Sequence, residues 1–356
     1  MRIVFKVGSN LLSTARGDID LRFLSKLAEA VKELIGKGDE VLIVSSGAVL
    51  CGAKKVGYGK RPEELTLRQA LAGIGQAYLM HLYDTVFSNY GLVVGQVLLT
   101  SDVFKKGNED RFKNAHGTLE RMLSMGVVPI INENDTVAVS ELIFGDNDFL
   151  SVYVSYMVGA NLLVILSSAG GLLNEEGEVI GEVSNVEEAM RFVKKTGSEF
   201  GSGGMVSKLE ATRLATSIGV PVIITGKDDD LVRVRDLKTS GTLFPPSRRK
   251  VRKRLKAIAM IEEPKGIVVI DEGAMRALRE GKSLLPAGVV RVEGGFSAGD
   301  VVSVLGPKGE LVGKGKVSFS AEDIEKVKGL KGYEVKERLR TTKEEVIHRD
   351  NFVPFQ

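Results

Sequence analysis

Short apolar runs alternate with helical patterns along this 356-residue chain as far as Pro246. The runs are typical of strands and occupy residues 3–7, 40–44, 93–98, 127–131, 162–166 and 220–224. Between them, apolar residues recur three and four positions apart, as in the series from Leu21 to Leu34, and mark one face of a helix. Strands that alternate with helices predict an α/β domain with a largely parallel central sheet.

The alternation of strand-like runs and helical patterns ends at Pro246. A basic run at 248–254 follows, and we interpret residues 247–257 as a solvated linker, with a nucleic-acid contact as the alternative. From residue 258 onward, glycine turns separate short strand-like runs at 266–270, 288–292 and 299–304. This pattern predicts two domains, residues 1–246 and a small β-rich domain of residues 258–356.

The charge balance, the single cysteine and the histidines limit the partners, the compartment and the metal sites that we expect. The chain carries 49 basic and 46 acidic residues, so its net charge predicts neither a nucleic-acid nor a membrane partner. A single cysteine, Cys51, excludes an intramolecular disulfide and fits a reducing cytoplasm. Its apolar neighbours predict a buried side chain rather than a reactive thiol. The histidines lie far apart in sequence, and no zinc site is expected.

Residues 149–174 carry no charge and are long enough to suggest a membrane span. Gly159-Ala160-Asn161 interrupts the stretch, however, and predicts a buried helix over 148–158 followed by a buried strand over 162–166. The N-terminus lacks the apolar region and cleavage site of a signal peptide. We therefore expect a cytoplasmic protein that makes no membrane contact.

Two of the predicted strands end in a glycine turn, and each turn has polar residues next to it in the sequence. Lys6 interrupts the first strand, and Gly8-Ser9-Asn10 comes directly after it. A buried lysine needs an anionic partner, although a lysine on an edge strand would reach solvent instead. The second strand leads into Ser45-Ser46-Gly47, where hydroxyl groups and the free N–H groups of a following helix suit a carboxylate or phosphate. A simple N-cap at Ser46 explains this segment equally well.

A third glycine loop, Gly201-Ser202-Gly203-Gly204-Met205, opens a helical pattern that carries Lys208 in its first turns. Such a loop suits the phosphates of a nucleotide. The G-x-x-x-x-G-K-[ST] pattern of a Walker A loop is absent from the sequence. There is also no G-x-G-x-x-G after a strand, which disfavours a dinucleotide enzyme.

Two clusters of acids and amides lie close together in mid-chain. Asn132-Glu133-Asn134-Asp135 follows a predicted buried strand, and Gly145-Asp146-Asn147-Asp148 precedes the apolar helix. Helix caps and Asx turns account for one or two of these residues but not for the whole set. The second cluster lacks the later glycine and glutamate of an EF-hand. These clusters predict a site for a small polar molecule.

Lysines beside glycine turns can neutralise a phosphoryl group during transfer, a reaction that depends mainly on positioning and electrostatics. The sequence offers no obvious general base near them. An acceptor carboxylate would not need one, because it is already ionised at neutral pH.

Together these motifs resemble the amino acid kinase family, and most closely its members that phosphorylate glutamate. The segments that carry the resemblance are 5–9, 45–48, 131–135, 145–148 and 203–208, with further support from 68–72, 75–76 and 110–115. Segments 271–274, 283–286 and 346–350 are similar to the PUA domain of the longer members. The resemblance covers essentially the whole chain. It implies an αβα sandwich followed by a PUA domain.

The resemblance also implies a reaction, ATP-dependent phosphorylation of the γ-carboxylate of L-glutamate, the first step of proline biosynthesis. Lys6 and Lys208 would contact the transferring phosphoryl group, and Asp148 would hold both ammonium groups in place. The residues implied to bind the amino acid are Ser46, Gly47, Asp135 and Asn147, with Asp135 taking its α-ammonium group. Those implied to bind the nucleotide are Lys6, Gly8, Ser9, Ser167, Ser168, Gly203, Gly204, Met205 and Lys208. Mg²⁺ would bridge the ATP phosphates without a dedicated protein site.

One position departs from the family pattern. Ser167-Ser168 follows the strand where the family usually has Thr-Asp, and the missing carboxylate leaves the nucleotide preference open. The resemblance further implies inhibition by proline, a glutamyl-phosphate reductase partner, and assembly into dimers or tetramers. The alternatives are a kinase for another acidic amino acid and an RNA-binding protein that acts through the PUA domain.

Overall fold

The computed structural model describes residues 1–14, 19–59, 62–105, 107–137, 147–186, 188–190, 193, 204–246 and 262–355. The chain divides into two compact units, which are described separately. The first consists of Met1–Thr216 and Val220–Pro246, and the second consists mainly of Ser247–Gln356. The predicted basic linker at 247–257 lies outside the described residues.

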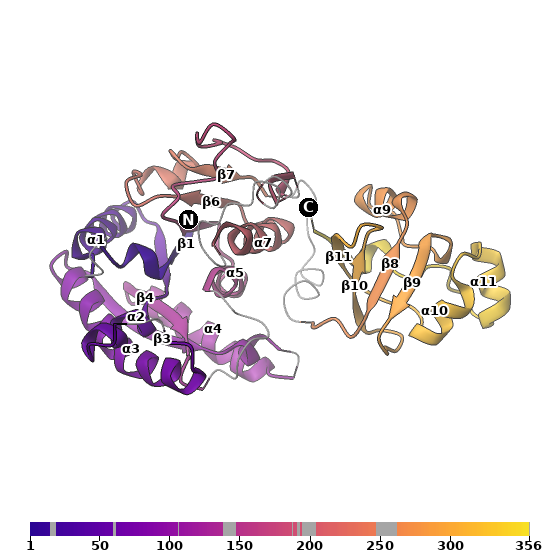
Figure 1. The fold of residues 1–356 in the computed structure, drawn as a ribbon, viewed down its shortest axis with the longest axis horizontal. Helices are drawn as coiled ribbons and strands as arrows, with labels where there is room; N and C mark the ends of the chain where they lie inside the picture. The colour runs from indigo at the N-terminus through magenta and orange to yellow at the C-terminus, as the bar shows by residue number, and fades with distance from the viewer. Residues whose placement is uncertain are drawn as a thin grey trace. The chain divides into compact units, whose positions relative to one another are not determined.

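A seven-stranded sheet runs through the first unit in the order β3-β4-β2-β1-β5-β6-β7 (Figure 1). Its strands are β1 (Arg2–Val7), β2 (Glu40–Ser45), β3 (Val93–Leu99), β4 (Val127–Glu133), β5 (Leu162–Leu166), β6 (Val222–Thr225) and β7 (Thr242–Phe244). All neighbouring strands pair in parallel except β6 and β7, which are antiparallel. The predicted, largely parallel α/β sheet is therefore confirmed.

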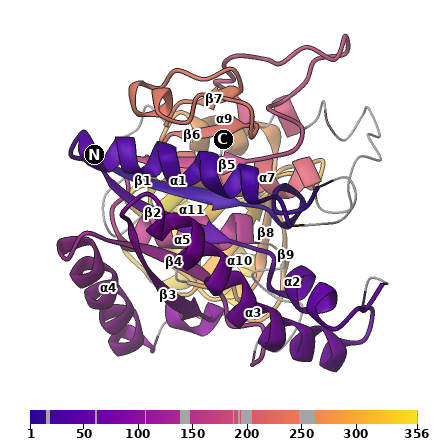
Figure 2. The ribbon, with the colours of Figure 1, turned by 90° about the vertical axis from the view of Figure 1, so that its left-hand side faces the viewer.

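Helices cover both faces of this sheet. They are α1 (Leu21–Gly36), α2 (Ala48–Lys55), α3 (Leu65–Ser88), α4 (Glu109–Ser124), α5 (Asn147–Met157) and α7 (Gly204–Ser217), with short 3-10 turns η1 (Ser9–Leu11), η2 (Ser101–Phe104) and η3 (Arg233–Asp236). Figure 1 shows α1 and α3 on one side of the sheet and α5 and α7 on the other. Figure 2 looks onto the face that α1 crosses. The arrangement is the expected αβα sandwich.

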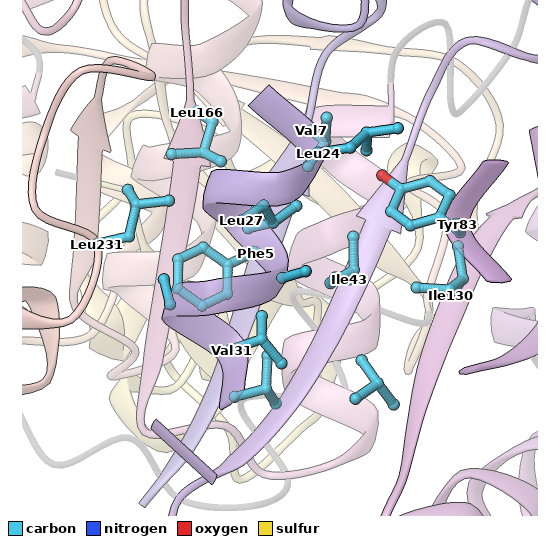
Figure 3. Packing of buried hydrophobic residues seen from close by; sticks show 14 of the residues in the cluster. Phe5, Val7, Leu24, Leu27, Val31, Ile43, Tyr83, Ile130, Leu166 and Leu231 are labelled. Carbon is cyan, nitrogen blue, oxygen red and sulfur yellow. The ribbon is translucent and has the colours of Figure 1, made fainter. Parts of the chain in front are cut away.

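One hydrophobic core of the first unit lies between the sheet and the helices α1 and α3. Phe5 and Ile43 of the sheet meet Leu24 and Leu27 of α1 and Tyr83 of α3, all of them buried (Figure 3). Burying each such side chain contributes roughly 1.5–3 kcal/mol to folding. Because the strands are apolar on both faces, the sheet is fixed between two helical layers and its carboxyl ends form a rigid rim.

Several predictions about local structure are corrected by the fold. Strand β4 extends to Glu133, so Asn132 and Glu133 belong to the strand rather than to the loop after it. The turn after Gly8 leads into the 3-10 turn η1, and the first α-helix begins only at Leu21. Strand β1 is central, which excludes the alternative of an edge-strand lysine at Lys6.

Two predictions about the uncharged and cysteine-containing segments are confirmed. The stretch after Asn147 forms helix α5 followed by the buried strand β5, and no helix in the described ranges is long and apolar enough to cross a membrane. Cys51 is buried in α2, where burial raises the pKa of its thiol to about 11 and keeps it protonated.

The second unit contains a five-stranded sheet of its own, in the order β12-β11-β10-β8-β9. Its strands are β8 (Ile267–Ile270), β9 (Val289–Glu293), β10 (Val301–Leu305), β11 (Leu311–Lys316) and β12 (Phe352–Pro354). Over residues 262–355, three helices accompany them: α9 (Glu272–Arg279), α10 (Ala321–Val327) and α11 (Gly332–Leu339). The expected β-rich domain is present. Its helices were not anticipated, although Asp271 and Ser320 cap two of them in the usual way.

Candidate active site

A buried carboxylate joins two lysines at the carboxyl ends of the central strands. Lys6 Nζ lies 2.6 Å from Asp148 Oδ1, and Lys208 Nζ lies 3.2 Å from Asp148 Oδ2. Asp148 is fully buried and Lys6 is only 2% exposed. These two contacts set two ammonium groups against one buried carboxylate, in a region where charges are weakly screened. Such a site attracts an anion that can share the two lysines.

Three different elements place these side chains. Lys6 is the penultimate residue of β1, Asp148 lies in the first turn of α5, and Lys208 lies near the start of α7. The positive end of the helix dipole favours a carboxylate in the first turn of α5. Lys208 Nζ also donates a hydrogen bond to the carbonyl oxygen of Gly204, 3.1 Å away, which orients its ammonium group toward the first turn of α7.

Gly8 brings the backbone close to the Lys6 ammonium group. A Cβ atom at this position would lie 3.7 Å from Lys6 Nζ and 4.0 Å from the carbonyl oxygen of Leu166. The backbone of residue 8 is extended, so glycine is not required here by its φ angle. Its absence of a side chain instead leaves room for a ligand beside the lysine.

A chain of side-chain hydrogen bonds runs beside the two lysines and their carboxylate. Asn147, the neighbour of Asp148, donates from Nδ2 to Ser46 Oγ at 2.8 Å and to Asn132 Oδ1 at 2.9 Å. Asn132 in turn donates from Nδ2 to Gln76 Oε1 at 2.9 Å. Strand β4, helix α5 and the turn before α2 therefore meet through their amide and hydroxyl groups. Asn132, which the family resemblance does not assign to the site, is a buried member of this hydrogen-bond network.

Gly47 sets the turn that presents Ser46. Its φ of 110° lies in the left-handed region, and it is the N-cap of α2. A Cβ atom there would lie 2.7 Å from Leu12 Cδ1, so a larger residue would also force the Leu12 side chain to shift. Ser46 itself is not the N-cap, which makes the alternative of a simple capping serine wrong.

Acidic groups at the end of β4 create a place that favours a cation. Burial, together with the neighbouring carboxylate of Asp135, raises the pKa of Glu133 to about 7. Burial also raises the pKa of Asp135, and the positive charge of Arg68 opposes that shift. Both shifts mean that the negative charges are poorly compensated. A cationic group of a ligand would stabilise them.

A cavity of about 330 Å³ lies at the ends of β5 and β6. Its lining includes Asn10, Ser167, Ser168, Gly226 and Lys227. Its volume is within the range of small-molecule pockets, roughly 300–1,000 Å³. Ser167 directly follows Leu166, whose carbonyl oxygen would lie 4.0 Å from a Cβ atom on Gly8, so the cavity and the Gly8 turn are both at the carboxyl end of β5.

Asp229 organises one wall of this cavity. It accepts hydrogen bonds from Thr225 Oγ1 at 2.7 Å, from Thr239 Oγ1 at 2.5 Å and from the backbone N–H of Ser240 at 3.2 Å. Burial alone would raise the pKa of Asp229, but these hydrogen bonds hold it below its ordinary value. Asp229 thus fixes the wall of the cavity as an ionised carboxylate.

Lys227 brings a second charge to the cavity wall. Its Nζ atom lies 3.1 Å from Asp20 Oδ2, and Asp20 also caps α1 by accepting from the N–H of Phe23 at 3.1 Å. Sequence reasoning gave no role to Asp20, Lys227 or Asp229. No spacing pattern connects Asp20 and Lys227, because they are 207 positions apart.

The other residues that the resemblance implies to bind the substrates come from separate segments of the first unit. Ser9 opens η1 beside Gly8, and Gly204 and Met205 form the first turn of α7. Asp135 lies in the turn after β4. Gly203, with the rest of the loop at 201–203, lies outside the described residues, as do Gly145 and Asp146. Within the described ranges, no group of three or more His, Cys, Asp or Glu side chains could hold a metal ion.

Comparison with known proteins identifies the family. The amino acid kinase family matches residues 1–226, and the PUA domain matches residues 266–339. Glutamate 5-kinase of Aquifex aeolicus is 65% identical over 355 residues, which cover 100% of both chains. Glutamate 5-kinase of Citrifermentans bemidjiense is 42% identical over 363 residues, which cover 99% of this chain and 97% of that protein.

Solved structures support the fold alone. The carbamate kinase of Giardia superposes with a TM-score of 0.50 at 17% identity, covering 69% of this chain and 99% of that one. The alternative of an RNA-binding protein receives no support from these comparisons. The chain belongs to the amino acid kinase family and, within it, to the glutamate 5-kinases that carry a C-terminal PUA domain.

Proposed function

We propose that the chain transfers the γ-phosphoryl group of ATP to the γ-carboxylate of L-glutamate and so forms L-glutamyl 5-phosphate. The observation that carries the proposal is the arrangement of Lys6, Asp148 and Lys208, which lies between a nucleotide-sized cavity and a cluster of amide and acidic groups. One side of this centre suits a nucleotide, and the other suits an amino acid. This reaction is the first step of proline biosynthesis.

The two lysines act on the phosphoryl group. As that group leaves ADP, negative charge is spread over its oxygens, and the ammonium groups of Lys6 and Lys208 stabilise it. Asp148 holds both lysines at fixed positions, so that little reorganisation is needed during transfer. The acceptor γ-carboxylate is ionised at neutral pH, since glutamate has an ordinary pKa of about 4.3, and no base has to deprotonate it.

The amino acid binds on the amide side of the centre. Ser46 and the N-terminus of α2 at Gly47 offer donors to a carboxylate, and Asp135 offers a negative charge to the α-ammonium group. Asn147 donates to Ser46 and directly precedes Asp148 in α5, and these contacts support a role for it in binding the amino acid. The raised pKa values of Glu133 and Asp135 support a cationic partner at this end.

The nucleotide binds from the cavity side. Gly8, Ser9, Gly203, Gly204 and Met205 would surround its phosphates together with the two lysines, and Ser167 and Ser168 would contact the nucleoside. Mg²⁺ would arrive on the ATP phosphates, because this ion keeps most of its water and binds few protein groups. The acidic and hydroxyl groups of the cavity wall fit a ribose at least as well as a phosphate.

Further properties follow from membership of the family. Inhibition by proline, use of the product by a glutamyl-phosphate reductase, assembly into homo-oligomers and a cytoplasmic location stay predictions. The domain division at 1–246, 247–257 and 258–356 also stays a prediction, and the two compact units support it.

Trapping of the acyl phosphate tests the proposal. The protein is incubated with ATP, Mg²⁺ and hydroxylamine, together with L-glutamate, L-aspartate or N-acetyl-L-glutamate in separate reactions. We expect hydroxamate with L-glutamate and little with the other two acids. Robust activity on aspartate or N-acetylglutamate, with none on glutamate, would assign the chain to a related kinase instead.

A further inference from the structure

We propose that Gln76 of α3 is a positioning residue that makes Asn147 present its amide oxygen, rather than its NH₂ group, to the amino acid. The inference deepens the proposed function and rests on it. Gln76 does not have to touch the substrate. It acts through Asn132, and its effect is to select an amino acid that carries a free α-ammonium group.

Each hydrogen bond in the series from Gln96 to Asn147 has a defined donor and a defined acceptor. Gln76 Nε2 donates to Gln96 Oε1 at 3.1 Å, which leaves Gln76 Oε1 to accept from Asn132 Nδ2 at 2.9 Å. Asn132 is therefore oriented with Oδ1 toward the site. There it accepts from the backbone N–H of Glu133 at 2.9 Å and from Asn147 Nδ2 at 2.9 Å.

Both hydrogens of Asn147 Nδ2 are then engaged inside the protein. One is donated to Asn132 Oδ1 and the other to Ser46 Oγ. Asn147 Oδ1 is buried and has no hydrogen-bond partner among the residues that the structure describes. An amide oxygen can only accept, so its partner must be a donor such as an ammonium group. Leaving it without a donor would cost free energy, which favours a ligand that supplies one.

The packing of α3 on α2 keeps Gln76 in reach of Asn132. A Cβ atom on Gly75 would lie 1.8 Å from the carbonyl oxygen of Ala48, and one on Gly52 would lie 1.9 Å from that of Leu71. The two helices thus touch backbone to backbone. Because Ser46 directly precedes Gly47, the N-cap of α2, this contact holds both ends of the series of hydrogen bonds at a fixed separation.

The test compares substrates with and without the ammonium group. Kinetic constants for L-glutamate and for glutarate, which lacks only the α-ammonium group, are measured for the full-length protein and for Gln76→Leu, Gln76→Glu and Gln96→Leu. Leucine at position 76 removes the acceptor for Asn132. Glutamate at position 76 keeps an acceptor there but loses the donor to Gln96. Leucine at position 96 removes only the outermost link.

We expect Gln76→Leu to raise KM for L-glutamate about three- to tenfold with a smaller change in kcat, the range that one hydrogen bond supports. The preference for glutamate over glutarate, compared as kcat/KM, should fall by a similar factor. Gln76→Glu should restore that preference, and Gln96→Leu should change it less than Gln76→Leu. Thermal midpoints of all variants show whether folding has been affected, and a folding defect alone would not alter the preference.

Two outcomes overturn the inference. One is an unchanged preference in Gln76→Leu, and the other is an equal loss of preference in Gln76→Leu and Gln76→Glu. Absence of glutamate-dependent activity in the unmodified protein would be a different failure, because it would contradict the proposed function itself.

Discussion

Lys6 Nζ lies 2.6 Å from Asp148 Oδ1, with the lysine side chain 3% exposed and the aspartate fully buried. The pair connects the centre of the sheet to the first turn of α5. A buried ammonium group next to a buried carboxylate is stable only while both are present. The contact therefore has to serve folding and phosphoryl transfer together.

Asp148→Asn should be both less stable and nearly inactive. Removing the carboxylate leaves Lys6 buried without its counter-charge, which costs about 3–5 kcal/mol. The lysines also lose their fixed positions, so kcat should fall by about 10²-fold or more. Denaturant unfolding and hydroxamate formation measure the two effects. Asp110→Asn is the matched control, because Asp110 lies in the first turn of α4 with its side chain 96% exposed, and it should behave like the unmodified protein.

Lys208→Ala should separate catalysis from substrate binding. The lysine is proposed to contact the phosphoryl group, whose charge develops only in the transition state, so kcat should fall far more than the affinity for glutamate. Steady-state kinetics together with calorimetric titration of glutamate distinguish the two effects. Lys26→Ala, which removes an exposed lysine of α1, should leave both unchanged. A loss confined to glutamate affinity would remove Lys208 from the phosphoryl site.

Gly75→Ala should disturb the active site from a distance. The added methyl group would overlap the Ala48 carbonyl oxygen, forcing α3 away from α2 at a cost of about 1–3 kcal/mol. Gln76 and Ser46 would then move apart. We expect a lower thermal midpoint and a raised KM for glutamate. Gly117→Ala in α4 is the control, since a Cβ atom there meets nothing within 4 Å and alanine favours the helix.

Glu133→Gln should change how stability depends on pH. The pKa of Glu133 is about 7 in the folded protein, above its ordinary value of 4.5, so the native state holds its proton more tightly than the unfolded state. Stability from this group is therefore present at low pH and is lost as pH rises from about 4.5 to about 7. With solvent screening the loss is about 1–2 kcal/mol.

The neutral glutamine removes this dependence. The free energy of unfolding of Glu133→Gln minus that of the unmodified protein should be about 1–2 kcal/mol larger at pH 8 than at pH 4.5. Urea unfolding at both pH values measures the gain. Glu29→Gln on the exposed face of α1 should show no such change. Equal stability differences at the two pH values would contradict the assigned pKa.

The sequence allowed the parallel sheet and most of its strands to be predicted, because fully buried strands such as β5 are unbroken apolar runs. It also identified Lys6 as unusual, since a charge in such a run must have a partner. Which residue provides that partner could not be derived from spacing. Asp148 is 142 positions away in the sequence, and only its place in the family pattern suggested the pairing.

Features that depend on close approach between distant elements could not be predicted. The backbone contact through Gly52 and Gly75 appears in the sequence only as two ordinary helical glycines. The antiparallel strand β7 is three residues long, too short to show a periodic pattern. Likewise, Gln76 looked like one polar residue among several until the fold placed it against Asn132.

The central claim is that the lysine pair directs the γ-phosphoryl group of ATP onto a side-chain carboxylate. The most direct test is phosphorus NMR of the reaction with ATP, Mg²⁺ and L-glutamate labelled with ¹⁸O in its γ-carboxylate. We predict an acyl-phosphate resonance that carries the isotope shift of a bridging ¹⁸O atom and is absent from Lys208→Ala. A phosphorylated product without that shift, or one formed equally well from L-glutamine, would contradict the account.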